Sequence, residues 1–171
     1  TGWHKNNIDG LAGSVRLEAS GPVMAAFPFV QAHFEKKELT ATVEVDNGSG
    51  GPFNGIVAFQ VLDPDAGGRL VTEFRSEAIA LPPGQTAEVA ARGAADKLTP
   101  WWPRIPGTPD GLPGSGPPKL YTLRAVVKTE DGQTVDVLED PFGYREVTIR
   151  GTGFHVNGRR FNFRSLISGQ G

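Results

Sequence analysis

The chain has 171 residues, and 17 basic against 19 acidic side chains give a formal net charge of −2. This balance offers no general attraction to nucleic acid or to an anionic membrane, so we expect neither partner. Cysteine is absent, which excludes disulfides and thiolate metal sites and leaves a cytoplasmic or an exported location open. No apolar run approaches the roughly 20 residues of a membrane span, and no signal peptide opens the sequence.

The composition favours short strands joined by many turns. There are 23 glycines and 14 prolines, yet 38% of the residues are hydrophobic. A hydrophobic fraction of this size argues against disorder, so the Gly and Pro excess is interpreted as turn chemistry. The first residue is Thr1, and we expect either a processed chain or a piece of a longer protein.

The predicted strands follow one another without helices between them. Residues 23–34 form an apolar stretch that Pro28 interrupts, as suits an edge strand. Alternating apolar and polar side chains predict further strands at residues 39–45, 57–61, 86–91 and 121–127, with a return strand through Val135 and Val137. Turn clusters separate them, including the hairpin turn Glu130-Asp131-Gly132. The pattern predicts an all-β fold, an antiparallel sandwich of about seven strands.

Residues 93–118 behave differently, because they form a long loop that contains Trp101-Trp102-Pro103 and then a Pro/Gly-rich run. A loop of this length inside a domain tends to be functional or mobile. Within it, we expect residues 104–117 to hold no regular structure and to be the most mobile internal segment. Further on, Asn157-Gly158 between Phe154 and Phe161 is a type I′ hairpin signal.

The order of motifs resembles the family 2 glycoside hydrolases, the group of β-galactosidases, β-mannosidases and β-glucuronidases. The resemblance is carried by the strand opening Pro118-Lys119-Leu120-Tyr121, the turn Asp131-Gly132, the motif Phe142-Gly143-Tyr144-Arg145 and the segment Phe154-His155-Val156-Asn157-Gly158-Arg159-Arg160. Trp102-Pro103 is similar to the segment that precedes the Leu-Tyr strand in that family. Residues 10–17 resemble the last strand of the sugar-binding jelly roll of the family.

The resemblance implies a three-part organisation. Residues 1–20 would end a preceding jelly-roll domain, residues 21–150 would form an immunoglobulin-like sandwich, and residues 151–171 would lead into a TIM-barrel catalytic domain. The general acid and the nucleophile would then lie beyond Gly171, in the barrel. The chain itself would be non-catalytic, without a cofactor, and its partners would be neighbouring domains of the same parent chain.

The chain offers no obvious catalytic pair or metal site of its own. Glu139-Asp140 and Glu130-Asp131 are sequence neighbours, and adjacent strand residues point to opposite faces, so neither pair converges on one substrate. Asp63 and Asp65 stand in a Gly/Pro turn, where Asp ordinarily caps backbone N–H groups. The three histidines, His4, His33 and His155, have no spacing that suggests a metal ligand set.

Two aromatic features have both a structural and a functional interpretation. Trp101 and Trp102 could stack on a sugar ring; alternatively, one tryptophan closes the end of the sandwich and the other contacts a neighbouring domain. Tyr121 opens a strand near the end of the predicted sandwich, where immunoglobulin-like folds often place a tyrosine whose hydroxyl bonds nearby backbone. We prefer that structural role for Tyr121.

The end of the chain is basic. After position 144, five arginines stand against the single acidic residue Glu146. Alone, they could form an anion-binding patch; with the family resemblance, they predict an interdomain interface. The interface candidates are Arg145, Arg150, Arg159 and Arg160.

Two functions remain open at this stage. The first is a non-catalytic sandwich that spaces and orients the sugar-binding and catalytic domains of a hydrolase acting on β-glycosides. The alternative is a free-standing carbohydrate-binding or adhesion module of immunoglobulin-like fold, with Trp101 and Trp102 as its glycan contacts. An autonomous enzyme is disfavoured, because no nucleophile–base constellation is visible.

Overall fold

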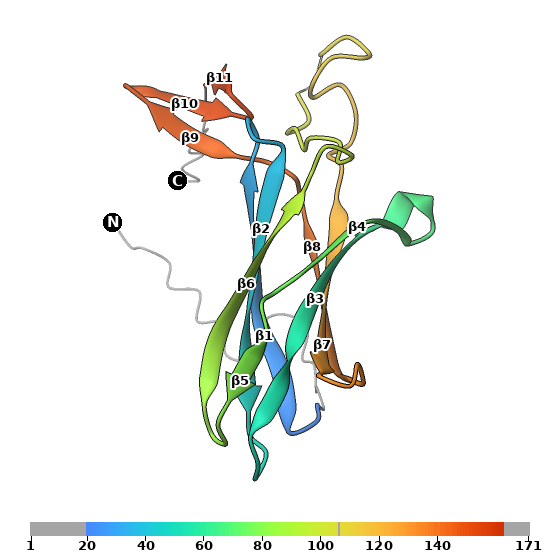
Figure 1. Ribbon diagram of the computed structural model, residues 1–171. Coiled ribbons are helices and arrows are strands. Elements are labelled where there is room, and N and C mark those ends of the chain that lie inside the picture. The colour runs from blue at the N-terminus through green and yellow to red at the C-terminus, as the bar shows by residue number, and fades with distance from the viewer. Residues whose placement is uncertain (1–19, 106, 163–171) are drawn as a thin grey trace, which may run out of the picture.

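The computed structural model describes residues 20–105 and 107–162, which form two layers of antiparallel strands and a small separate sheet (Figure 1). Within this part of the chain, the only helical element is the 3₁₀ turn η1 (Pro64–Ala66), and no helix is long and apolar enough to cross a membrane. The strands are β1 (Val23–His33), β2 (Glu38–Asn47), β3 (Phe53–Asp63), β4 (Arg69–Arg75), β5 (Ile79–Leu81), β6 (Thr86–Ala94), β7 (Tyr121–Thr129), β8 (Thr134–Phe142), β9 (Val147–Arg150), β10 (Gly153–Val156) and β11 (Arg159–Phe161).

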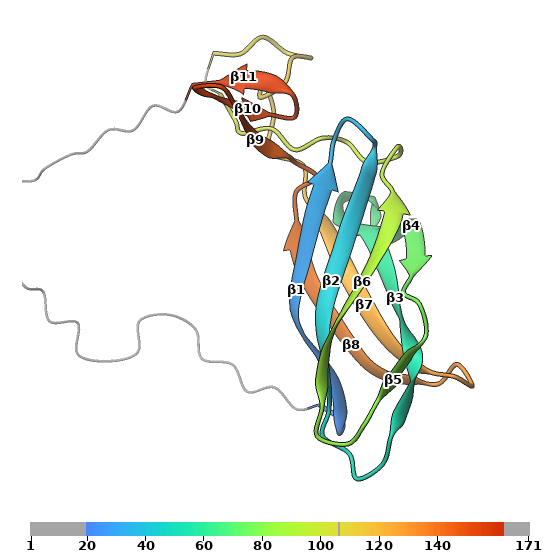
Figure 2. The ribbon, with the colours of Figure 1, turned by 60° about the vertical axis from the view of Figure 1, so that its left-hand side comes forward.

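The two layers match an immunoglobulin-like sandwich. One sheet has the order β1-β2-β6, and the other has the order β4-β3-β7-β8 with β5 paired to β3. Figure 2 shows the first layer in front of the second. Every pairing in both sheets is antiparallel. The prediction of an all-β antiparallel sandwich is therefore confirmed.

The core follows from the alternation of apolar residues. Leu39, Val43 and Val45 on β2 are at most 1% exposed, and they face Val57 and Phe59 of β3, which are fully buried. The predicted inward stripe of β7 is buried as well: Tyr121, Leu123, Ala125 and Val127. A period of two places every second side chain on one face, so each alternating segment contributes a row to the core.

The described part of the sandwich contains eight strands, close to the seven expected, and two of them, β4 and β5, were not located from the sequence. In β4, Leu70 and Val71 are adjacent apolar residues, and the pairing with β3 skips Val71, which disrupts the alternation. β5 has three residues, too few for a periodic signal. The strand β9 pairs with β10 in the small sheet, so the boundary expected at residue 150 falls inside that sheet.

The edge strand β1 is interrupted where the sequence predicted. The pairing of β1 with β2 shifts register between Ala26 and Phe29. Phe27 has a φ of 50°, a left-handed conformation that is uncommon for a bulky residue. Because Pro28 has no N–H to donate, the bulge breaks the free edge of this sheet.

The assignments at both ends of the sequence stay predictions. Residues 1–19, assigned to the end of a jelly roll, lie outside the described residues. Residues 163–171, assigned with residues 151–162 to the lead-in to a barrel, lie outside them too.

Replacing Leu123 tests the assignment of the two faces of β7. Leu123 is 1% exposed in the core, so Leu123→Ala is expected to lower the free energy of unfolding by about 2–5 kcal/mol. Thr122 is half-buried on the opposite face, and Thr122→Ala is expected to cost clearly less. Urea denaturation measures both changes, and equal midpoints for the two variants would contradict the assignment.

Candidate functional site at the loop end of the sandwich

The long loop between β6 and β7 and the small sheet β9–β11 lie at the same end of the sandwich (Figures 1 and 2). Trp101, Trp102 and the four arginines singled out in the sequence lie in or next to these segments. Asn157 and Gly158 have φ values of 49° and 75°, and Val156 pairs with Arg159, so the predicted type I′ hairpin is confirmed.

Asn157 connects three segments of the chain. Its side-chain Nδ2 donates to the carbonyl of Trp101 at 2.9 Å, and its Oδ1 accepts from the backbone N–H of Glu146 at 2.9 Å. Its own backbone N–H donates to the carbonyl of Glu146. The side chain is buried, with 3% of the residue exposed. The loop, the segment after β8 and the hairpin are therefore held by one residue.

Two arginines of this region stack on the two tryptophans. The guanidinium carbon of Arg145 lies 4.6 Å from the ring centroid of Trp101, and that of Arg159 lies 5.9 Å from the ring of Trp102. Such cation–π contacts stabilise by about 0.5–1 kcal/mol at exposed sites. They join the loop to the segments that follow β8 and β10.

Trp101 packs at the end of the sandwich. The backbone N–H of Trp101 donates to the carbonyl of Tyr144 at 2.9 Å. A Cβ atom at Gly143 would lie 2.6 Å from the indole Cδ1, so glycine is required for this close approach. Arg145 and Gly143 thus both contact Trp101, and the two tryptophans are each half-buried. Stacking of either tryptophan on a sugar stays a prediction.

Arg150 joins the small sheet to the turn between β1 and β2. Its guanidinium donates to the carboxylate of Glu35 at 2.5 Å, and this hydrogen bond and charge lower the pKa of Glu35. Both side chains are largely exposed, so the pair contributes little to stability. Arg145, Arg150 and Arg159 therefore all make contacts within the chain, and Arg160 is exposed on β11. The interface role of the four arginines stays a prediction.

The loop is also fixed at its start and at its end. The hydroxyl of Tyr121 accepts a hydrogen bond from the backbone N–H of Thr99 at 2.9 Å, which confirms the structural role predicted for this tyrosine. At the other end, Lys119 donates to Asp63 at 2.5 Å and to Asp65 at 2.7 Å. Asp63 also accepts from the N–H of Asp65, so the predicted turn cap is confirmed as well.

The ion pair between Lys119 and Asp63 shifts the pKa values of both groups. The hydrogen bond and charge of Lys119 lower the pKa of Asp63, and the two carboxylates raise the pKa of Lys119. A carboxyl group with a lowered pKa stabilises the fold at neutral pH, and the contribution is lost as the pH falls through that pKa. Asp63 and Asp65 are therefore engaged in anchoring the loop.

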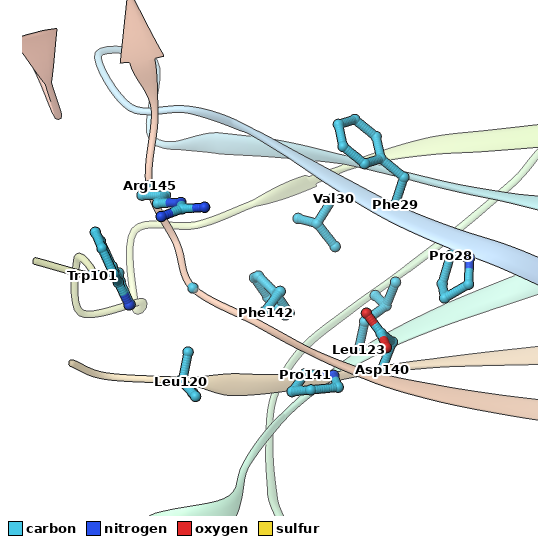
Figure 3. A pocket seen from close by; sticks show the side chains of 11 residues that line it. Pro28, Phe29, Val30, Trp101, Leu120, Leu123, Asp140, Pro141, Phe142 and Arg145 are labelled. Atoms are coloured by element: carbon cyan, nitrogen blue, oxygen red, sulfur yellow. The ribbon is translucent and has the colours of Figure 1, made fainter. Parts of the chain in front are cut away.

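A cavity of about 480 Å³ opens between the edges of the two sheets, beside Trp101 (Figure 3). Side chains of the β1 bulge, of the end of β8 and of the loop surround it. Its lining includes Pro28, Val30, Trp101, Leu120, Leu123, Asp140, Pro141, Phe142 and Arg145. The sequence had singled out Trp101, Asp140 and Arg145 separately, and the fold brings them to one cavity.

A second cavity of about 450 Å³ lies between the sandwich and the small sheet, where Phe34, Leu98 and Tyr144 contribute apolar surface. The ring centroids of Phe34 and Tyr144 are 6.0 Å apart. Burial raises the pKa of Tyr144, and its hydroxyl has no hydrogen-bond partner among the described residues. In the same part of the chain, no group of three or more His, Asp or Glu side chains is placed to hold a metal ion.

Substitutions can remove the side-chain hydrogen bonds of Asn157 while the left-handed backbone conformation at this position is kept. Asn157→Gly keeps a residue that accepts positive φ, but it leaves the Glu146 N–H and the Trp101 carbonyl without their partner, each at a cost of about 1–3 kcal/mol. We expect hydrogen exchange to accelerate at Glu146 and across β9–β11, with β7 unchanged. Asn157→Asp keeps the acceptor and should loosen the Trp101 contact while Glu146 stays protected. Unchanged exchange at Glu146 in the glycine variant would contradict this role.

The middle of the loop is expected to exchange fastest. Its described residues form turns whose hydrogen bonds stay within the loop, such as Ile105 N–H to the Gly114 carbonyl at 2.9 Å, and no strand or helix is formed there. We predict that amides 107–117 exchange faster than those of residues 121–127, since only local bonds protect them. Equal protection of the two segments would show that the loop belongs to the folded core.

Comparison with known proteins identifies the family. The family model of the glycosyl hydrolases family 2 matches residues 26–145. A search of curated proteins found no match.

Solved structures of low sequence identity share the fold. The chain is similar to a β-glucuronidase from glycoside hydrolase family 2, with a TM-score of 0.61, 22% identity, and coverage of 82% of this chain and 14% of that one. A β-galacturonidase of the same family from Eisenbergiella tayi, bound to galacturonate, also gives a TM-score of 0.61 and 22% identity, with 82% and 22% covered. A family member from Bacteroides cellulosilyticus gives a TM-score of 0.63 at 15% identity, with 82% and 17% covered.

The chain spans less than a quarter of the length of each of these solved structures. The match to the family model covers well over half of the sequence, from the bulged edge strand to the Phe-Gly-Tyr-Arg motif after β8. The chain belongs to family 2 of the glycosyl hydrolases.

Proposed function

We propose that this chain is a non-catalytic sandwich domain that sets the spacing and orientation of the sugar-binding and catalytic domains in a hydrolase of β-glycosides. The observation that carries the proposal is the junction at Asn157, which fixes the small sheet and the loop to one end of the sandwich. A hairpin held in this way transmits the orientation of the sandwich to the chain that follows it. Membership of the family and the small share of each enzyme covered support the same role.

The small sheet offers a surface for the neighbouring domain. Val147 and Ile149 are 51% and 69% exposed on one face of it, and Phe154, opposite Ile149 in the register, shares that face. Apolar side chains in such a group are typical of interaction surfaces. In this proposal, the apolar face meets the catalytic domain, while Arg145 and Arg159 hold the loop in place by stacking on the tryptophans.

The carboxylates of the described residues support a non-catalytic role. A retaining glycosidase needs two carboxyl groups about 5 Å apart across the sugar. Glu139 pairs with Arg124, while Asp140, the next residue on the strand, lies opposite Leu123 and so on the core side. Asp63 and Asp65 bind Lys119. None of these pairs has two available carboxylates facing one space.

The 171-residue chain is expected to show no hydrolysis of 4-nitrophenyl β-galactoside, β-mannoside or β-glucuronide, because residues 20–105 and 107–162 hold no convergent pair of carboxylates. Absorbance of released nitrophenolate measures the reaction. Turnover above background that disappears in Glu139→Gln or in Glu130→Gln would assign catalysis to this chain and contradict the proposal.

The orienting role is tested in the longer enzyme that contains the chain. Asn157→Gly is expected to lower kcat/KM by tenfold or more, since small displacements far from the reacting atoms can cost about 100-fold. Thr134→Ala, an exposed position on β8, serves as the control and should leave kcat/KM unchanged. An Asn157→Gly enzyme with full activity and a loosened small sheet would overturn the orienting role.

A further inference from the structure

The open side of the sandwich is formed by two edge strands, β1 and β8. They belong to different sheets, and one carboxylate joins them: the backbone N–H of Ala25 donates to Oδ2 of Asp136 at 2.7 Å. Asp136 lies opposite Val127 in the register of β8 with β7, so its side chain points to the core side. The edges are thus closed at this point by a charge-assisted hydrogen bond.

Asp140 repeats the position of Asp136 four residues further along β8. It lies opposite Leu123, and directly opposite residues share a face, so Asp140 also points to the core side. At this level β1 is bulged and presents Pro28, which has no N–H to donate. Among the residues that the structure describes, no hydrogen bond or ion pair reaches the Asp140 carboxylate; the residue is exposed, so water takes the place that the Ala25 N–H has at Asp136.

The Asp140 side chain lines the cavity beside Trp101 (Figure 3). Val30, Leu123 and Phe142 provide apolar surface, and the rings of Pro28 and Pro141 flank Asp140. The lining also includes Arg145, whose guanidinium lies over Trp101 and has no carboxylate partner in the described part of the chain. The volume of about 480 Å³ falls in the range of small-molecule sites.

We propose that this cavity binds a saccharide ring. Its C–H face would pack on the apolar surface, one or two of its hydroxyl groups would donate to Asp140, and Arg145 would donate to its oxygen atoms. Asp140 and Arg145 are both exposed, and a hydroxylated ring would take the place of water as the donor to the carboxylate and as the acceptor from the guanidinium. The site lies in the sandwich itself, so the inference goes beyond the orienting role proposed above and does not depend on it.

Other occupants fit the cavity less well. An added β-strand needs an unbroken edge, and the bulge with Pro28 on β1 and Pro141 on β8 interrupts both edges. A cationic side chain would approach Asp140 but would also meet the positive charge of Arg145. A metal ion would find a single carboxylate where several oxygen ligands are needed.

The test is an NMR titration of the ¹⁵N-labelled 171-residue chain with methyl β-D-galactopyranoside, methyl β-D-glucuronide and cellobiose. The expected result is a saturable change in the amide shifts of Val30, Leu123 and Gly143 and in the indole signal of Trp101 with at least one of these probes. Asp140→Ala should weaken that binding roughly tenfold or more, the effect of losing a hydrogen bond to a charged group.

Glu139→Ala is the matched control, because it removes the neighbouring carboxylate from the opposite face of the same strand and should leave binding unchanged. Absence of saturable shifts with all three probes would overturn the proposal, as would equal binding by the wild type and Asp140→Ala. If Asp140→Ala increases self-association in sedimentation while no probe binds, Asp140 protects the strand edge from a second copy, which also overturns it. The parent enzyme takes no part in this test, so its outcome is separate from that of the orienting role.

Discussion

The hydrogen bonds of one buried amide hold together the end of the sandwich where the long loop and the small sheet lie. Asn157 donates to Trp101 and accepts from Glu146, which lie 56 and 11 positions away in the sequence. An amide is suited to this place because it offers a donor and an acceptor at once. An aspartate there would set a negative charge against the Trp101 carbonyl, and a leucine would leave both backbone groups unpaired. The left-handed conformation of the turn is tolerated by asparagine, so one residue satisfies both constraints.

From this junction, the arrangement of the loop follows. Its start is held by the N–H of Thr99 on Tyr121, its next segment by Trp101, and its end by Lys119 on Asp63 and Asp65. Between these anchors, residues 107–117 bond only within the loop. A long insertion with fixed ends costs little in closure entropy, which grows only slowly with length. The fold therefore keeps a Pro/Gly-rich segment without losing the packing on either side of it.

How far the sequence predicted this structure depends on the range of each interaction. The strands around Leu39, Phe59 and Leu123 were predicted because alternation is a local signal, and the turn at Asn157-Gly158 because its backbone geometry demands those residues. The partners of the Asn157 side chain, and the pairing of Lys119 with Asp63, were not predicted. They are contacts between distant segments, and no local pattern encodes them. The cavity escaped prediction for the same reason, since Pro28 and Asp140 meet only when the two sheets pack.

The two inward carboxylates of β8 show how the sandwich treats its open side. Asp136 and Asp140 stand on the same face of one strand, yet only Asp136 has a backbone donor across the gap. A carboxylate at the rim of a core is unfavourable unless it is paired or hydrated; Asp136 is half-buried and paired, whereas Asp140 is exposed to water. The β1 bulge withdraws the donor from Asp140 by placing a proline there. The same bulge lines the cavity with Pro28, so the missing backbone donor and one wall of the cavity belong to a single structural feature.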